Sequence, residues 1–152
     1  LSQALKGTDI DVDFLGDGED FVYASVLKES KPNLFGHQNF LGFVADPISY
    51  MKEHSSVFVF TSKAKYEGLP LSLVEAMSVG IPCIAYKTDA TKYVLGEEGL
   101  FYSTKEELKD IIFKLKSDKT LYEEKAKYSL ERAKLFYKDH VKKLWEEILK
   151  NT

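Results

Sequence analysis

Two glutamates separated by seven residues flank a short segment that suits a ligand carrying both hydroxyl and phosphate groups. Glu67 and Glu75 enclose the sequence Gly-Leu-Pro-Leu-Ser-Leu-Val. A carboxylate accepts several hydrogen bonds, so it can bind the neighbouring hydroxyls of a ribose or a sugar. Gly68 permits a tight turn and the close approach of a ligand. The spacing therefore predicts two acids that bind hydroxyl groups, with a segment between them that contacts another part of the same ligand.

The segment between the two acids predicts the start of a helix that faces an anion. Pro70 suits the first position of a helix, because that position needs no N–H donor. The helix is expected over 71–79 and ends at Gly80. Its free amides and positive dipole end would bind a diphosphate. Glu75 would then hold a ribose and Glu67 a sugar, so the predicted ligand is a nucleotide sugar; two isolated glutamates would more simply be solvated surface residues.

The elements that must position these residues alternate along the chain as short apolar segments and amphipathic segments, which is typical of a parallel sheet covered by helices. The apolar run 57–61 is expected to end at the carboxyl edge of the sheet, where open α/β folds bind ligands. The other strands are expected at 11–15, 34–36, 39–43, 82–86 and 100–102. Helices are expected at 1–5, 20–29, 47–54 with Asp46 as N-cap, 71–79, 90–95, 105–116, 119–136 and 138–150.

Composition and charge narrow the class of protein. The 152 residues are 44% apolar and 30% charged, which is ordinary for one globular domain. The net charge of −3, with both signs interspersed, argues against a nucleic-acid partner. Arg132 is the only arginine, which is few for a protein that grips phosphates with guanidinium groups. Cys83 is the only cysteine, so no disulfide framework is expected and the thiol is interpreted as buried and inert.

Other candidate motifs have simpler explanations. Asp11 and Asp13 match an Asp-x-Asp metal motif, but alternation along a strand accounts for them. The three histidines have no spacing typical of zinc or triad chemistry, and no metal site is predicted. The helix at 138–150 has an apolar face opposite a face of mixed charge, which favours packing against protein over binding to a membrane. That apolar face consists of Val141, Leu144, Trp145, Ile148 and Leu149.

The stretch from Ser62 to Pro82 resembles the retaining GT-B glycosyltransferases called group 1 or family 4. The family's hallmark is a pair of glutamates separated by seven residues, then Ala-Met and a Gly-x-Pro before a strand, and all of these are present in order. The sequence Phe-Leu-Gly-Phe-Val at 40–44 is similar to the family's strand beside the nucleotide base. The sequence Phe-Leu-Gly-Asp-Gly at 14–18 is similar to an earlier strand end. The resemblance covers essentially the whole chain.

This resemblance implies an α/β fold, a Rossmann-like parallel sheet with helices on both faces, which forms the C-terminal half of a GT-B enzyme. Residues 1–152 are then expected to be the nucleotide-sugar-binding domain, truncated at its N-terminal edge, with the acceptor-binding N-terminal domain absent. The intact enzyme would be a hexosyltransferase-type glycosyltransferase of bacterial-type polysaccharide biosynthesis that transfers the sugar with retention. It would need no cofactor besides the donor, and the fragment alone is expected to be inactive.

The family's functional residues carry over onto matching positions. Glu67 would contact the transferred sugar at the catalytic position, and Glu75 would hold the ribose hydroxyls. The remaining donor contacts would come from Gly68, Leu69 and Leu71 through their backbone, from Phe43 and Val44 beside the base, and from Gly16. The family's phosphate-binding arginine and lysine are expected to lie before Leu1.

The chain departs from the family pattern in two further places. Pro70 stands where many relatives have glycine, which removes one amide donor. Asp-Ala-Thr-Lys at 89–92 stands where many relatives have Gly-Gly-x-x-Glu, which weakens a site assignment there. Lys92 is interpreted as a solvated helix lysine in preference to a phosphate contact.

The expected partners are a nucleotide sugar and a carbohydrate or lipid-linked acceptor bound through the missing N-terminal domain, without nucleic acid. The expected location is the cytoplasm, and peripheral association of the full-length enzyme with the inner face of the membrane stays open. Two alternatives also stay open. One is a nucleotide-sugar epimerase of the same fold, which the glutamate pair followed by Ala-Met disfavours. The other is a non-catalytic sugar-nucleotide-binding or partner-stabilising domain.

Overall fold

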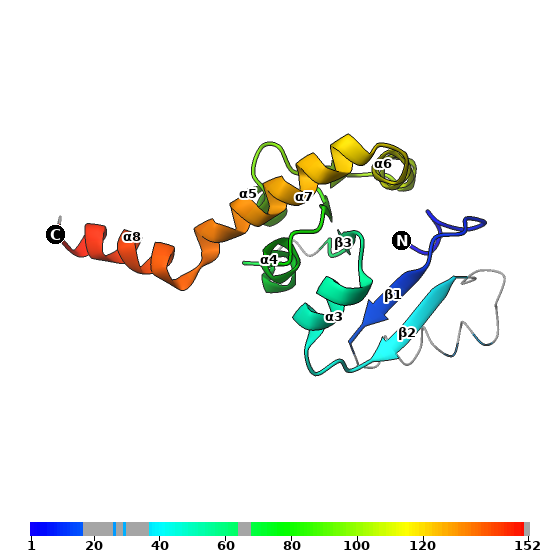
Figure 1. Cartoon of the computed structure of the whole chain (residues 1–152), viewed down its shortest axis with the longest axis horizontal. Helices are drawn as coiled ribbons and strands as arrows, with labels where there is room; N and C mark the ends of the chain where they lie inside the picture. The colour runs from blue at the N-terminus through cyan, green and yellow to red at the C-terminus, as the bar shows by residue number, and fades with distance from the viewer. Residues whose placement is uncertain (17–25, 27–28, 30–36, 64–67, 151–152) are drawn as a thin grey trace.

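The computed structural model describes residues 1–16, 26, 29, 37–63 and 68–150, and its strands form two parallel sheets (Figure 1). In the first sheet β1 (Val12–Leu15) pairs with β2 (Gln38–Gly42). In the second, β3 (Phe58–Phe60), β4 (Cys83–Tyr86) and β5 (Leu100–Tyr102) lie side by side in that order. The predicted helix at 20–29, apart from two of its residues, and the predicted strand at 34–36 lie outside the described residues. The other predicted strands are confirmed.

The helices follow the strands in the predicted order. They are α3 (Pro47–His54), α4 (Leu71–Ser78), α5 (Asp89–Leu95), α6 (Lys105–Ser117), α7 (Lys119–Ala133), the 3₁₀ helix η1 (Lys134–Phe136) and α8 (Lys138–Lys150). The predicted N-cap of α3 is confirmed, because the Asp46 carboxylate accepts a 3.0 Å hydrogen bond from the amide of Ser49.

Two predicted helix bounds are wrong. Residues 1–5 form turns in which the amides of Ala4 and Leu5 both donate to the Leu1 carbonyl, because so short a segment cannot sustain a helix by itself. The helix expected to continue to Phe136 stops at Ala133, and the chain tightens into η1. Such 3₁₀ tightening satisfies carbonyls that a helix end leaves without partners.

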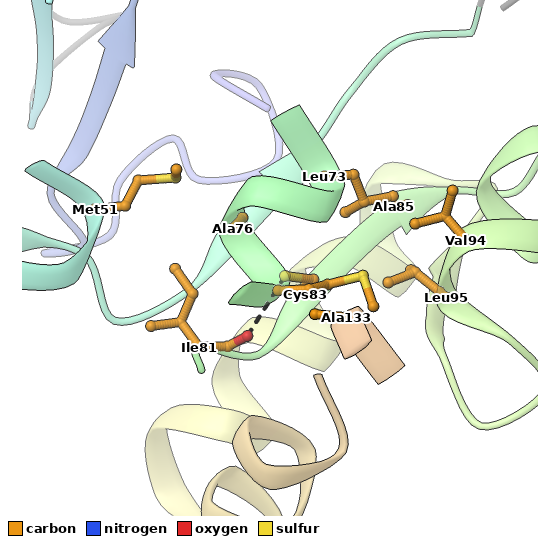
Figure 2. Packing of buried hydrophobic residues seen from close by; sticks show 10 residues of the cluster. Met51, Leu73, Ala76, Ile81, Cys83, Ala85, Val94, Leu95 and Ala133 are labelled. Carbon is orange, nitrogen blue, oxygen red and sulfur yellow. Dashed lines mark hydrogen bonds between the residues drawn. The ribbon is translucent and has the colours of Figure 1, made fainter. Parts of the chain in front are cut away.

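Helices cover both faces of the β3–β4–β5 sheet, as predicted, and the alternating residues of β4 show this directly. Cys83 and Ala85 face a core made with α4, α5 and the end of α7, where Figure 2 shows side chains from these elements packed together. Ile84 points to the opposite face, into a core made with α6 and the residues 1–5. The side-chain period of two in a strand thus serves two separate cores.

Cys83 is confirmed as a buried thiol. Its side chain is 3% exposed and its sulfur lies 3.4 Å from the Ile81 carbonyl oxygen (Figure 2). Burial raises its pKa to about 12, against a smaller opposite effect of a hydrogen bond to Ser129. Since the thiolate is the reactive form, this cysteine is chemically quiet at neutral pH.

Helix α8 extends away from the rest of the chain (Figure 1), and none of its residues is buried. Its five predicted apolar-face residues are between 40% exposed, at Val141, and 70% exposed, at Leu149. Among the described helices, none is both long enough and apolar enough to span a bilayer.

Candidate functional site

The N-terminus of α4 presents backbone amides with no side-chain cap. Pro70 occupies the N-cap with φ −71° and ψ 90°, one position before the predicted one, and a proline side chain offers no acceptor. By contrast α3, α5, α6 and α7 each begin with an Asp or Thr side chain that accepts from a helix amide. The amides of Leu73 and Val74 both donate to the Pro70 carbonyl. The N–H groups of Leu71 and Ser72 therefore remain as donors at the positive end of the helix dipole.

Glu75 lies on the outer side of α4. The inner side of this helix, formed by Leu73, Ala76 and Met77, is fully buried. Ser72 precedes Glu75 by three residues, so the hydroxyl and the carboxylate share one face of the helix. Both residues line a cavity of about 960 Å³. The predicted place of Glu75 about one turn into the helix is confirmed, and its role as a ribose ligand stays a prediction.

Hydroxyl groups that sequence analysis missed join Glu75 at this cavity. Thr61 and Ser62 follow the carboxyl end of β3 and line the same space as Ser72 and Glu75. The signal was present in the sequence, because hydroxyl residues directly after a buried strand lie at the ligand-binding edge of a parallel sheet. The Glu75 carboxylate and the hydroxyl residues Ser72, Thr61 and Ser62 thus form a polar part of the cavity lining beside the N-terminus of α4, which suits a hydroxyl-rich ligand that also carries phosphate.

The other predicted donor residues lie apart from this cavity lining. Leu69 and Leu71 are 44% and 63% exposed and, with the exposed Gly68, lead into α4. Phe43 is 75% exposed and precedes the part-buried Val44 after β2. The predicted sugar contact Glu67 lies outside the described residues.

Gly16 joins the ends of β1 and β2. Its amide donates a 2.9 Å hydrogen bond to the carbonyl of Gly42, which directly precedes Phe43. Its φ of +130° lies in a region that side-chain-bearing residues rarely adopt. The structure therefore brings Gly16 and Phe43 to the same end of the β1–β2 sheet, and their contacts with a donor stay a prediction.

Two lysines near the carboxyl ends of the strands, Lys63 and Lys92, have different surroundings. Lys63 follows β3, and its ammonium group lies 4.7 Å above the ring of Tyr86. Burial lowers the pKa of the Leu1 amino group, and the nearby positive charges of Lys63 and Lys105 lower it further. Lys92 is exposed and lies 3.8 Å from Asp89 on its own helix, in keeping with its interpretation as a solvated lysine.

Thr88 and Thr91 fix the start of α5, in and beside the segment 89–92. The Thr88 and Thr91 side chains cap each other's backbone amides at the start of α5. The hydroxyl of Thr91, which is 1% exposed, also donates a 2.7 Å hydrogen bond to the carbonyl of Tyr86 at the end of β4. These bonds fix the turn from β4 to α5.

The two aspartates of the Asp-x-Asp pattern are engaged by protein groups. Asp11 contacts the His37 ring at 3.1 Å. Asp13 accepts hydrogen bonds from the Asn39 amide at 2.9 Å and from the Tyr50 hydroxyl at 2.7 Å. The bond to Asp13, with burial as a smaller contribution, raises the pKa of Tyr50. Asp13 thereby ties β1 to both β2 and α3.

Comparison with known proteins finds one matching family model and one similar sequence. The sequence model of the family described as glycosyl transferases group 1 matches residues 1–134. A protein of Methanocaldococcus jannaschii described as an uncharacterized glycosyltransferase is 40% identical over 73 residues, which are 47% of this chain and 16% of that protein.

Solved structures share the fold over nearly the whole chain. The Anabaena protein HepE in complex with UDP has a TM-score of 0.83 at 24% identity, and the match covers 99% of this chain and 43% of HepE. HepE with UDP-glucose gives 0.80 at 25% identity with the same coverage. The pneumococcal O-GlcNAc transferase GtfA in complex with UDP and GlcNAc gives 0.68 at 21% identity, over 93% of this chain and 29% of GtfA. The chain thus spans less than half the length of these similar proteins.

Proposed function

Because the chain belongs to the group 1 glycosyl transferases, we propose that it is the donor-binding domain of an enzyme that transfers a sugar from a nucleoside diphosphate. One observation carries the proposal: the uncapped amides of α4 and the Glu75 carboxylate lie together at the carboxyl edge of β3. Structures of the similar HepE hold UDP or UDP-glucose, which supports a donor of this class. A non-catalytic binding domain or an epimerase is not favoured.

The proposed roles follow from the chemistry of each group. The amides of Leu71 and Ser72, at the positive end of α4, would neutralise the diphosphate as it leaves, so that no metal is required. Glu75 would accept from the two ribose hydroxyls, and Phe43 with Val44 would border the base. Glu67 would contact the sugar, as the family resemblance implies.

The finer features of the reaction rest on the family alone. We propose a hexose donor, transfer with retention, and an acceptor held by a separate domain. Because the chain spans 43% of the length of HepE, we propose sugar transfer for the whole enzyme and nucleotide binding for this domain.

A titration with nucleotides tests the donor site. UDP, GDP and ADP are added separately to the chain, and binding is followed by calorimetry and by NMR shifts of the Leu71 and Ser72 amides. Glu75→Gln should raise the dissociation constant of the nucleotide about tenfold to hundredfold, since a hydrogen bond to a charged group contributes about 1.5–3 kcal/mol. The matched control is Glu97→Gln, an exposed glutamate in the turn after α5 that does not line the cavity.

Three outcomes separate the possibilities. If Glu75→Gln binds as tightly as the unchanged chain, the ribose role is wrong. Equal losses in both variants would indicate a general charge effect instead of a contact. If 2′-deoxy-UDP binds to the unchanged chain as tightly as UDP does, Glu75 does not accept a hydrogen bond from the ribose 2′-hydroxyl.

A further inference from the structure

Two tyrosines at the carboxyl ends of β4 and β5 form a cluster that the donor site does not include. Tyr86 ends β4 and Tyr102 ends β5, and the two residues are paired in register. Their rings lie edge-on, with centroids 5.6 Å apart. Tyr86 shares the side of β4 with Ile84, so both rings lie on the α6 side of the sheet, opposite to α4. The cluster and the N-terminus of α4 are therefore on opposite sides of one sheet edge.

Two ammonium groups lie beside these rings. The Nζ atom of Lys63 is 4.7 Å from the centroid of the Tyr86 ring. Lys105 begins α6, and its Nζ donates a 3.0 Å hydrogen bond to Oε1 of Gln3. Burial lowers the pKa of the Leu1 amino group, and the positive charges of Lys63 and Lys105 lower it further. Since both charges act on one amino group, the two lysines share this corner of the sheet edge.

No carboxylate of the described residues neutralises these two ammonium groups. Glu107 accepts hydrogen bonds from two backbone amides of the loop between β5 and α6, at 2.7 and 3.3 Å. Glu106 is exposed on the first turn of α6. Within the described ranges neither Lys63 nor Lys105 forms an ion pair. The two ring hydroxyls likewise have no hydrogen-bond partner among the described residues. The cluster therefore combines positive charge with unused hydroxyl donors.

The segment after β3 connects the cluster with the donor site. Ser62 lines the same cavity as Glu75, whereas Lys63, Tyr86 and Tyr102 do not line it. Consecutive residues of this segment thus serve two places, the cavity at Ser62 and the aromatic pair at Lys63. A ligand bound at the cluster would lie beside the donor without sharing its contacts.

We propose that Lys63, Lys105 and the hydroxyls of Tyr86 and Tyr102 bind a phosphate group of a second ligand, separate from the diphosphate contacts proposed at α4. Phosphate oxygens accept hydrogen bonds from both ammonium and phenol groups, and they supply the negative charge that the two lysines lack. The contact of an exposed lysine with an aromatic ring is weak, so an anion readily takes its place. In a sugar transferase this ligand is an acceptor that carries phosphate. That identity rests on the proposed function, whereas the anion site itself does not.

Inorganic pyrophosphate is the probe, because it has the phosphate chemistry without a base or a sugar. NMR follows the ring signals of Tyr86 and Tyr102 at the cluster and the amide signals of Leu71 and Ser72 at α4 in the same titration. Pyrophosphate should shift the ring signals. Lys63→Met removes the charge and keeps an apolar stem over the ring. It should raise the dissociation constant measured at the rings about tenfold, the effect of one hydrogen bond to a charged group.

The matched control is Lys87→Met. Lys87 is exposed and directly follows Tyr86, so strand alternation turns its side chain to the other side of the sheet. This variant removes the same charge from the same sheet edge. It should change the dissociation constant at the rings by less than about twofold, since exposed charges that make no contact are screened. Sodium chloride at equal ionic strength should leave the ring signals in place.

The proposal is wrong if pyrophosphate moves only the α4 amides and leaves the tyrosine rings unchanged. It is also wrong if Lys63→Met and Lys87→Met lose affinity equally, since the effect is then one of general charge. UDP should bind Lys63→Met as tightly as the unchanged chain, and a tenfold loss there would assign the phosphate to the donor instead. The donor site is tested by UDP with Glu75→Gln, and the cluster by pyrophosphate at the rings, so either proposal fails without the other.

Discussion

The guanidinium group of Arg132 donates from Nη2 to the carbonyl oxygen of Tyr93 at 2.7 Å, across 39 residues of sequence. Its Nε also donates to the Val94 carbonyl at 3.0 Å, and the Tyr128 hydroxyl donates to the Leu95 carbonyl at 2.7 Å. The last carbonyls of a helix have no hydrogen-bond partners within that helix. Here the side chains of Tyr128 and Arg132 on α7 donate to the last carbonyls of α5. The chain's one arginine therefore has a structural role, and the diphosphate contacts proposed above come from the backbone amides of α4.

Replacement of this arginine should destabilise the fold. Arg132→Lys keeps the charge but cannot reach both carbonyls with one planar group. We expect the free energy of unfolding to fall by about 1.5–3 kcal/mol, the range for a hydrogen bond to a charged group. Urea unfolding followed by circular dichroism measures this, with Lys142→Met on exposed α8 as the control. A variant as stable as the parent would show that these bonds contribute nothing net.

The buried hydroxyl of Thr91 should matter for stability in a second, independent way. Thr91→Val keeps the side-chain shape but leaves the Tyr86 carbonyl without its 2.7 Å donor. An unsatisfied buried polar group costs about 1–3 kcal/mol. Thr120→Val, at an exposed position of α7, is the matched control and should change the free energy of unfolding little. Equal effects of the two substitutions would contradict the interpretation of Thr91 as a scaffold residue.

Alkaline pH should weaken the fold through Cys83. Its pKa is raised from 9.0 in the unfolded chain to about 12 in the fold, so the folded state retains the thiol proton longer. This contribution is complete below pH 9.0 and is lost as the pH rises toward about 12. Urea unfolding across this range should therefore show a smaller decline for Cys83→Ala than for the parent.

Alkylation provides a check on the same residue. Iodoacetamide should label Cys83 in the native chain only as fast as the surrounding core opens, and rapidly in urea. Labelling of the native chain as fast as that of the unfolded chain would show that the thiol is accessible. An identical pH slope in Cys83→Ala would assign the alkaline weakening to the tyrosines whose pKa values are also raised, Tyr50, Tyr102 and Tyr122.

Removal of α8 should leave the rest of the chain intact. No residue of α8 is buried, and Trp145 is 61% exposed. A chain that ends at Tyr137 should therefore unfold with a free energy within about 0.5 kcal/mol of the parent. Trp145, the only tryptophan, should be quenched by acrylamide nearly as well in the folded chain as in urea. Protected tryptophan emission would show instead that the apolar face is covered, for instance by self-association.

Much of the fold could be predicted from local pattern. The apolar runs at β3 and β4 and the amphipathic period of α6 predicted their bounds within one or two residues, because burial on one or both faces constrains every side chain of an element. The position of Glu75 on α4 followed from Pro70 and Gly80, which limit the helix at either end. Where the burial pattern was weak, as at residues 1–5, the predicted helix was wrong.

The structure places Glu75 on α4 beside the cavity, whereas Glu67 lies outside the described residues. The sequence by itself determined the spacing of the acids, the helix start between them and the family they belong to, since these depend on neighbouring residues and on backbone stereochemistry. Only the tertiary structure decided that Thr61 and Ser62 line the same cavity as Glu75, that Arg132 donates to the end of α5, and that β1 and β3 face the same cavity. Those relationships join residues far apart in the chain, and they depend on how the layers pack, which no local pattern encodes.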